Sequence, residues 1–394
     1  MATAIATYRP VRVFPTSPPF SFSNPSSTPP HIVDSGRLTT LCSKKSIKLQ
    51  SSHQLFFTNR WVVGRTKELG LTRGFCKSGL SEINQGEDKE HVSRATLIRR
   101  AVKLPIYTVA LVPLTVGSAA AYLQVHSFDA GRYFVLLFSS VLIITWLNLS
   151  NDAYDFETGA DKDKKESVVN ISGSHSGVLC AAYICLALGS SGLLWAALQA
   201  GDVRVAALLF CAILCGYVYQ CPPCRLSYHG LGEPLCFAAF GPLATSAFYF
   251  SQATKSQTGI LPFSSTVLSV SVLIGVTTTL ILFCSHFHQI DGDWEVGKMS
   301  PLVRIGTKRG SEVVRYSVIV LYSLLCAFAA LKTLPLTCTF FTLLTLPLGK
   351  LLIDFVHENH NDKIKIFMAK YYCVRLHASF GVALALGLFA ARFT

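Results

Sequence analysis

Residues 131–161 read GRYFVLLFSSVLIITWLNLSNDAYDFETGAD, an apolar run of nearly bilayer length that ends in a cluster of Asn and Asp. A helix needs roughly 20 mainly apolar residues to cross a membrane, and this run is close to that length. Membrane helices usually end in aromatic or cationic residues, and carboxylates at that depth are costly. The acidic end of this run therefore predicts a functional site at the end of a transmembrane helix.

The composition of the whole chain also indicates an integral membrane protein. Of its 394 residues, 51% are hydrophobic and only 14% are charged, whereas soluble domains have roughly 25% charged residues. The net charge of +13 does not indicate a nucleic-acid partner, because the first 80 residues hold 11 Lys and Arg against 2 acids. Most of the basicity thus belongs to the leader, and we expect membrane lipid around the rest of the chain.

The leader has the composition of an organellar targeting peptide. It is rich in Ser, Thr and Pro, almost free of acids, and lacks the compact apolar segment of a secretory signal. Its Ser and Pro content favours a plastid over a mitochondrion as the destination. We expect residues 1–85 to be a chloroplast transit peptide and disordered leader; a disordered cytosolic tail is the alternative.

From Lys103 onward, apolar runs near bilayer length alternate with polar stretches. They predict an all-α fold, a polytopic membrane bundle of about nine transmembrane helices, as one domain over residues 95–394. The expected helices are 104–124, 131–150, 176–199, 204–220, 232–252, 265–288, 313–333, 335–354 and 371–391.

Taken together, the connections after the second, fourth, sixth and eighth predicted helices contain more residues and more Lys and Arg than the other connections. Because successive spans alternate in direction, these four loops are expected at one membrane face. The positive-inside rule assigns that face to the stroma if the organelle is a plastid.

The first acidic cluster lies at the end of the second predicted helix. Residues at i, i+3, i+4 and i+7 share a helix face, and Asn148, Asn151, Asp152 and Asp155 have this spacing. Their side-chain oxygens suit Mg²⁺, which proteins usually hold with one or two carboxylates plus substrate phosphates. Lys162, in the cationic loop that follows, is a candidate for binding the anion. A capped helix end and a cationic membrane anchor are the structural alternatives.

The second cluster is HFHQIDGDWEVGK, residues 286–298, which begins in the last residues of the sixth predicted helix. His286, Gln289 and Asp293 would share one face of a continuing helix, and Asp291 would point elsewhere. A buried histidine bonded across helices is the structural alternative for His286. Both clusters are expected at the same face of the bundle, which is difficult to explain as coincidence.

Two oxygen-rich clusters beside an apolar bundle suit a lipid diphosphate. Mg²⁺ together with Lys298 and Arg304 would hold the headgroup, and metal coordination lowers the barrier to breaking the C–O bond. The ring of Tyr219 could stabilise the resulting allylic cation, although an aromatic belt residue is equally expected there. An ion-coupled transporter is the alternative from another class, but transporter sites tend to lie at the bilayer midplane on broken helices.

The pair NDAYDFETGAD and DGDWEVGK resembles the two motifs of the UbiA superfamily of membrane prenyltransferases, and the resemblance extends over residues 95–394. NLSNDAYDFETGADK, YHGLGEPLCFAAFGPLAT and GKMSPLVRIGT look like the branch that acts on dihydroxynaphthoate. This implies transfer of a phytyl group from phytyl diphosphate to 1,4-dihydroxy-2-naphthoate, with loss of CO₂ and diphosphate, in a chloroplast membrane. Only GLGE and HFHQ distinguish it from plastid relatives that use homogentisate or chlorophyllide.

The residue patterns and the resemblance together predict roles for individual residues. The expected catalytic residues are Asn151, Asp152, Asp155 and Asp293. The expected Mg²⁺ ligands are the same four residues and Asp291. The expected substrate-binding residues are Asn148, Lys162, Tyr219, His286, Gln289, Lys298 and Arg304. In the family the second motif usually reads DxxxD. In this sequence Gln289 occupies the position of the first acid, and its amide brings no negative charge.

Overall fold

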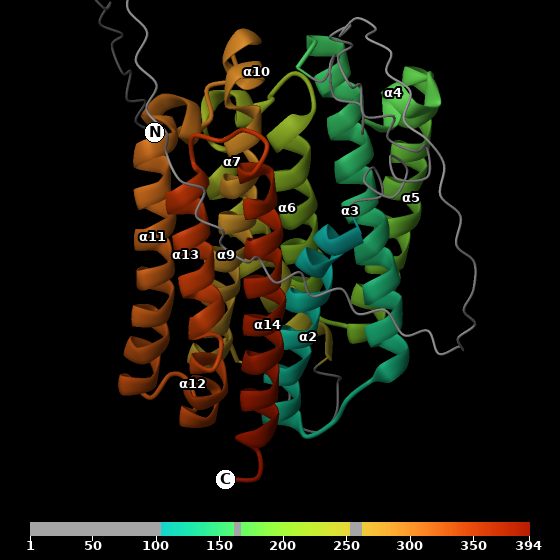
Figure 1. Ribbon diagram of the computed structural model, residues 1–394. Coiled ribbons are helices and arrows are strands. Elements are labelled where there is room, and N and C mark those ends of the chain that lie inside the picture. The colour runs from blue at the N-terminus through green and yellow to red at the C-terminus, as the bar shows by residue number, and fades with distance from the viewer. Residues whose placement is uncertain (1–103, 161–166, 253–261) are drawn as a thin grey trace, which may run out of the picture. The chain divides into compact units, whose positions relative to one another are not determined.

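The computed structural model describes residues 104–160, 167–252 and 262–394. Within these ranges every regular element is a helix (Figure 1), so the prediction of an all-α fold is confirmed. The leader, residues 1–85, and Lys162 lie outside the described residues.

The described bundle consists of long helices joined by shorter helical turns. Its first half contains η1 (Leu104–Tyr107), α2 (Thr108–Val125), α3 (Ala130–Thr158), α4 (Val168–Ser172), α5 (His175–Ala200), α6 (Val203–Gln220) and η2 (Leu226–His229). Its second half contains α7 (Gly232–Ala238), the π-helix η3 (Ala239–Thr245), α8 (Ser246–Gln252), α9 (Ser265–Ser285), η4 (Phe287–Gln289), α10 (Ile290–Glu295), α11 (Pro301–Ala330), α12 (Leu336–Leu343), α13 (Leu346–Asn359), η5 (Ile366–Met368) and α14 (Ala369–Ala390).

Seven helices among the described residues are long and apolar enough to cross a membrane. An eighth span is formed if α12 and α13, bent by 46° at their junction, count as one. The remaining predicted span, 232–252, is the run of α7, η3 and α8, whose centre is π-helical. The described helices therefore agree with a polytopic bundle of about nine spans.

Two predicted boundaries differ from the structure in a way that matters for the acidic clusters. Helix α3 continues to Thr158 instead of ending near residue 150, and Gly159, with φ of 83°, ends it in the left-handed conformation. Its 29 residues extend about 43 Å, beyond the roughly 30 Å of hydrocarbon in a bilayer. Similarly, α9 ends at Ser285, and the second cluster continues through a 3₁₀ turn into α10. The length of an apolar run reflects the thickness of the bilayer, whereas the end of a helix is set by its capping residue.

The described parts of the four long loops lie at one end of the bundle, as the sequence predicts (Figure 1). Arg225, after α6, pairs with Glu157 of α3 at 3.2 Å. The backbone N–H of Met299, after α10, donates to the carbonyl oxygen of Tyr228 at 2.9 Å. Thr307 of α11 donates to Asn361, after α13, at 3.2 Å. The segments that carry the two acidic clusters are thereby held together.

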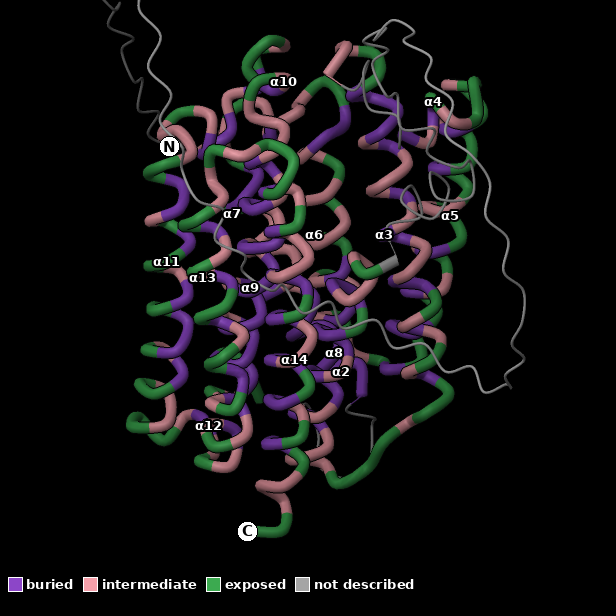
Figure 2. Tube along the Cα trace, viewed as in Figure 1, coloured by how far each residue is buried: buried purple, intermediate pink, exposed green. Residues whose placement is uncertain are grey.

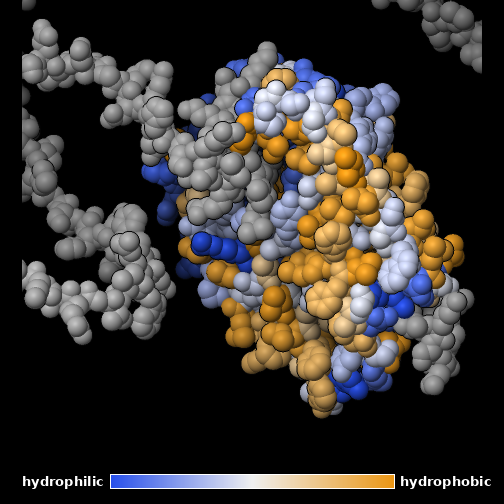
Figure 3. Space-filling view, turned by 90° about the vertical axis from the view of Figure 1, so that its right-hand side faces the viewer, coloured by the Kyte–Doolittle hydropathy of each residue, from blue (hydrophilic) through white to orange (hydrophobic). Residues whose placement is uncertain are grey.

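The described helices bury their inward sides and expose large hydrophobic side chains outward, as expected in lipid. Buried positions follow the inner sides of the helices in Figure 2, and hydrophobic residues cover much of the middle of the face in Figure 3. Exposed examples are Phe134, Phe138, Leu198, Phe210 and Val320. Glycines allow close helix packing: a Cβ on Gly189 of α5 would lie 3.0 Å from the carbonyl oxygen of Ser139 in α3.

Candidate active site

A cavity in the bundle has polar side chains at the end where the long loops meet, and apolar side chains deeper inside. Along α3 its lining extends from Asp155 to Ser140, which is about 22 Å at the rise of an α-helix. Its polar lining residues include Asn148, Asn151, Asp152, Asp155, Tyr219, Gln220, His286, His288, Gln289, Lys298, Lys370 and Tyr371. Deeper lining residues include Ile143, Ile144, Leu209, Ile213, Phe240, Ala244 and Phe248.

Helix α3 supplies one wall of this cavity. Asn148, Asn151, Asp152 and Asp155 all line it, in agreement with the helix face that their spacing predicts. Asn151 Nδ2 donates to Asp155 Oδ2 at 2.5 Å, and Asp152 Oδ2 accepts from the backbone N–H of Val168 at 3.2 Å. Both carboxylates are buried; the amide of Asn151 holds Asp155, and the first backbone N–H of α4 holds Asp152.

Lys298 joins the two acidic clusters. Its Nζ lies 3.7 Å from Asp155 Oδ2 and 3.5 Å from Asp293 Oδ1, and the residue is only 5% exposed. Burial lowers the pKa of Lys298, but the carboxylates of Asp155 and Asp293 outweigh this effect and raise it, so the ammonium stays charged. One acid from each cluster therefore pairs with the same lysine, which lines the polar end of the cavity.

Tyr228 was not predicted as a site residue, yet it contacts the same carboxylate. Its hydroxyl donates to Asp155 Oδ1 at 3.2 Å, and its ring centroid lies 5.7 Å from Lys298 Nζ. Burial and the nearby Asp155 raise the pKa of Tyr228, so the hydroxyl remains a donor. Its position in the YHGLGE segment was the available signal, but spacing alone cannot show a contact with α3.

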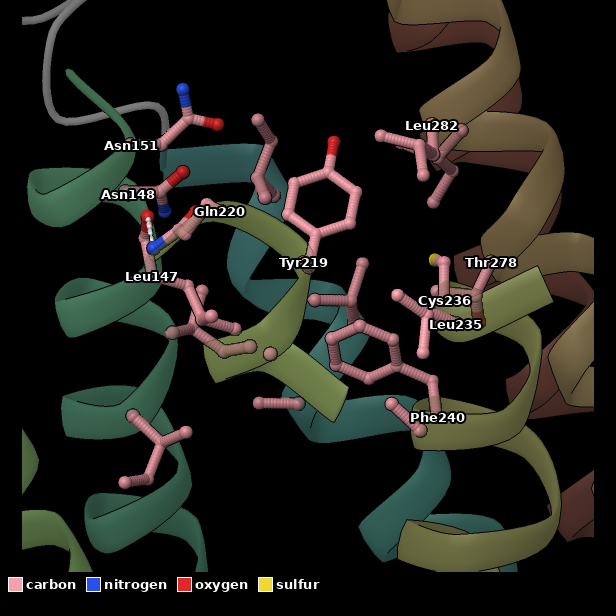
Figure 4. A pocket seen from close by; sticks show the side chains of 18 of the residues that line it. Leu147, Asn148, Asn151, Tyr219, Gln220, Leu235, Cys236, Phe240, Thr278 and Leu282 are labelled. Atoms are coloured by element: carbon pink, nitrogen blue, oxygen red, sulfur yellow. Dashed lines mark hydrogen bonds between the residues drawn. The ribbon is translucent and has the colours of Figure 1, made fainter. Parts of the chain in front are cut away.

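Tyr219 lies between the two walls of the cavity, at the C-terminal end of α6. Figure 4 shows Asn148 and Asn151 on one side and Leu282 of α9 on the other, with the Tyr219 hydroxyl directed toward the same end as Asn151. Phe240, an apolar lining residue, lies on the side of the ring away from the hydroxyl (Figure 4).

The second cluster is divided between the cavity and the surface. His286 and Gln289 line the cavity, and Asp293 is buried beside Lys298. Asp291 instead pairs with Lys363, and its side chain is 57% exposed. Asp291 thus lies apart from the cavity, but the continuing helix assumed in the prediction is interrupted after Ser285, and Asp293 does not line the cavity with His286 and Gln289.

Arg304 lies outside the cavity lining. Its Nε donates to the carbonyl oxygen of Met299 at 3.1 Å, and its Nη2 donates to that of His229 at 2.8 Å. The guanidinium thus links the loop after α10 to the loop after α6. This arrangement holds the segment that carries Lys298.

Comparison with known proteins shows which family the chain belongs to. Residues 110–374 match the model of the UbiA prenyltransferase family. The chain belongs to the UbiA prenyltransferase family. It is 61% identical over 318 residues to the chloroplastic 2-carboxy-1,4-naphthoquinone phytyltransferase of Arabidopsis thaliana, over 81% of this chain and 83% of that one. It is 42% identical over 292 residues to the 2-carboxy-1,4-naphthoquinone phytyltransferase of Synechocystis sp., over 73% of this chain and 91% of that one.

A solved structure shares the UbiA fold. The apo structure of a UbiA homologue from Aeropyrum pernix K1 aligns with a TM-score of 0.53 at 13% identity, over 73% of this chain and 98% of that chain. The likeness at this identity concerns the arrangement of helices only.

The oxygen donors of this UbiA family member suit a metal bound together with a phosphate. Among the described residues, no three His, Cys, Asp or Glu side chains are grouped as a protein-only metal site. Mg²⁺ usually needs no such cage, because substrate phosphates and waters complete its octahedron. Asp293 Oδ2 is buried without a hydrogen-bond partner among the described residues, and such an oxygen favours a cation. The donor set therefore fits Mg²⁺ with a diphosphate.

Proposed function

We propose that this chain transfers a phytyl group from phytyl diphosphate to 1,4-dihydroxy-2-naphthoate, with decarboxylation, in phylloquinone biosynthesis. One observation carries the proposal: Lys298 joins two acidic clusters at the polar end of a cavity whose depth is apolar. The charged, polar end of the cavity suits a diphosphate, and its apolar depth suits a long isoprenoid tail. The names of the Arabidopsis and Synechocystis relatives support this choice of donor and acceptor.

We further propose that residues 95–394 form the prenyltransferase domain in a chloroplast membrane and that residues 1–85 are its transit peptide. The family match at 110–374 and the description of the Arabidopsis relative as chloroplastic support this division. The outward hydrophobic surface of the described helices supports a membrane location.

In the proposed reaction, the diphosphate binds between α3 and α10. The fixed charge of Lys298 and the amide of Asn148 bind phosphate oxygens. Bound Mg²⁺ would neutralise the diphosphate and ease cleavage of the C–O bond. We assign Asn151, Asp152 and Asp155 to its first site.

We assign Asp293 to the second site, with Gln289 as a neutral oxygen ligand. Asp291, paired with Lys363, adds negative charge nearby and is the weaker candidate ligand. We assign Arg304 to holding the Lys298 loop, because both of its donors reach backbone carbonyl oxygens.

The apolar walls of the cavity protect the carbon that reacts, C1 of the phytyl group, from water. They surround the isoprenoid tail and exclude water, which would otherwise capture the allylic cation. The face of Tyr219 is suited to stabilise the positive charge next to the departing diphosphate. Electron density for the new C–C bond then comes from the aromatic acceptor.

The test uses membranes that contain the full chain, supplied with Mg²⁺, 1,4-dihydroxy-2-naphthoate and either phytyl or geranylgeranyl diphosphate. Mass analysis should detect the decarboxylated phytyl product, and homogentisate in place of the naphthoate should give none. Asp152→Asn or Asp155→Asn should lower turnover by about 100-fold or more at unchanged protein abundance. Asp354→Asn, an exposed carboxylate of α13, is the matched control. Normal turnover in either site variant would refute the assignment.

A further inference from the structure

The GLGE segment at the start of α7 and the HFHQ segment after α9 meet inside the bundle. Glu233, in GLGE at the start of α7, accepts a hydrogen bond from Nδ1 of His286, in HFHQ after α9, at 3.1 Å. Their side chains are only 10% and 4% exposed. Glu233 Oε2 has no hydrogen-bond partner among the described residues. A buried carboxylate is costly unless it is paired, and only one of the two oxygens of Glu233 is bonded among the described residues.

Glu233 determines what His286 presents to the cavity. Because Nδ1–H donates to the carboxylate, Nε2 is the nitrogen that remains for a ligand, and in the neutral ring it is a hydrogen-bond acceptor. His286 lines the cavity, whereas Glu233 does not. The pair therefore has the arrangement of a carboxylate that orients an imidazole as a proton acceptor.

An aromatic and cationic wall lies in the same cavity. His288, Phe367, Lys370 and Tyr371 all line it. The rings of His288 and Phe367 are 4.9 Å apart, and Lys370 Nζ lies 3.9 Å from the Phe367 ring centroid. Aromatic faces suit a flat bicyclic ring, and an ammonium beside them suits its carboxylate.

We propose that Glu233, His286 and Lys370 form the subsite for the aromatic acid acceptor. The proposal rests on the function proposed above and assigns the acceptor side of the same cavity. Lys370 binds the carboxylate, His286 is the catalytic base for a ring hydroxyl, and Glu233 is a positioning residue that acts through His286.

The step balances without an oxidant or reductant. His286 Nε2 takes the hydroxyl proton, and the oxygen electron pair moves into the ring. The ring carbon that bears the carboxylate forms a bond to C1 of the phytyl group, while the C–O bond breaks and its electron pair leaves with the diphosphate. The carboxylate then departs as CO₂, its bonding pair returns to the ring, and the ring oxygen recovers the proton from His286.

The test measures steady-state kinetics in membranes containing the full chain, with the naphthoate and phytyl diphosphate varied separately. His286→Asn keeps a donor near Glu233 but removes Nε2, so kcat should fall about 100-fold or more. Glu233→Gln should lower kcat about tenfold, because an amide orients the imidazole less strongly than a carboxylate. In both variants the KM for phytyl diphosphate should stay within about twofold of wild type.

Lys370→Met should instead affect mainly KM: the KM for the naphthoate should rise about tenfold, and kcat should change less. His357→Asn and Glu358→Gln, exposed residues in the last turns of α13, are the matched controls and should keep wild-type kinetics. A uniform rise of both KM values in the site variants would overturn the proposal, because it would show general loss of structure.

A variant with no measurable product is resolved by Mg²⁺-dependent binding of labelled phytyl diphosphate to the membranes. Retained binding supports an acceptor-side defect, and lost binding overturns it. If the wild-type chain makes no product from the naphthoate, the proposed function itself fails. If the wild type is active and both Glu233→Gln and His286→Asn behave like the controls, only the acceptor subsite fails.

Discussion

Replacing Lys298 by Met gives the most direct test of how the two acidic clusters are held together. Met fills a similar volume but removes the ammonium from between Asp155 and Asp293. Both carboxylates are buried, so neither can recover its hydration without movement of the chain. The variant therefore leaves two like charges close together in a site that the native protein neutralises.

The distances set the size of the effect. At 3.7 and 3.5 Å and an effective dielectric constant of about 20, each ion pair contributes about 4 to 5 kcal/mol of attraction. Removing Lys298 also removes the cost of burying its charge, which offsets much of that sum. We expect a net loss of about 3–5 kcal/mol in the free energy of unfolding, the usual range when one partner of a buried pair is deleted.

The assay is equilibrium unfolding of the purified chain in detergent with EDTA present. Lys308→Met, an exposed lysine of α11, is the control and should change stability by less than about 0.5 kcal/mol. Adding Asp293→Asn to the Lys298→Met variant should restore part of the stability, because one unpaired charge is removed. If Lys298→Met were as stable as Lys308→Met in EDTA, the inference that this lysine neutralises both carboxylates would be wrong.

Two further predictions concern the metal and the helix packing. EDTA should abolish the phytylated product, measured by mass, and excess Mg²⁺ should restore it, because the clusters bind the diphosphate through the metal. Unchanged product formation in EDTA would instead favour metal-independent chemistry. An ion-coupled carrier would yield no phytylated product under either condition. Gly387→Ala should destabilise the contact of α14 with α12 by about 1–3 kcal/mol in the same unfolding assay, because its Cβ would lie 2.7 Å from the backbone nitrogen of Cys338 and 3.0 Å from the carbonyl oxygen of Thr337. Gly131→Ala, whose Cβ would meet only Asp129 Oδ1 at 3.5 Å, is the control, and equal stability of the two variants would contradict the packing argument.

Much of the first wall of the site was predictable from the sequence. The spacing of Asn148, Asn151, Asp152 and Asp155 fixes their common face, because 3.6 residues per turn is a local property of the helix. Their position in the bilayer was less certain. The apolar run suggested a helix that ends near residue 150, but Gly159 ends it later, so the acids belong to the helix itself.

Contacts between distant segments were not predictable in the same way. Arg304 was expected at phosphate oxygens, yet its donors reach carbonyl oxygens of two loops. Tyr228, Glu233 and Lys370 were not predicted as site residues, because nothing in the spacing of a single sequence relates them to α3 or α9. Their contacts depend on which helices become neighbours.

The sequence by itself determined the membrane environment, the approximate spans and the two acidic clusters, because hydropathy and helical period are set by residues close together in the chain. Only the tertiary structure decided that Lys298 lies between Asp155 and Asp293 and that Glu233 orients His286. These contacts join residues on different helices, and their geometry depends on side-chain packing across the bundle. Local periodicity directs a side chain to a face of its helix, but packing determines what that side chain meets.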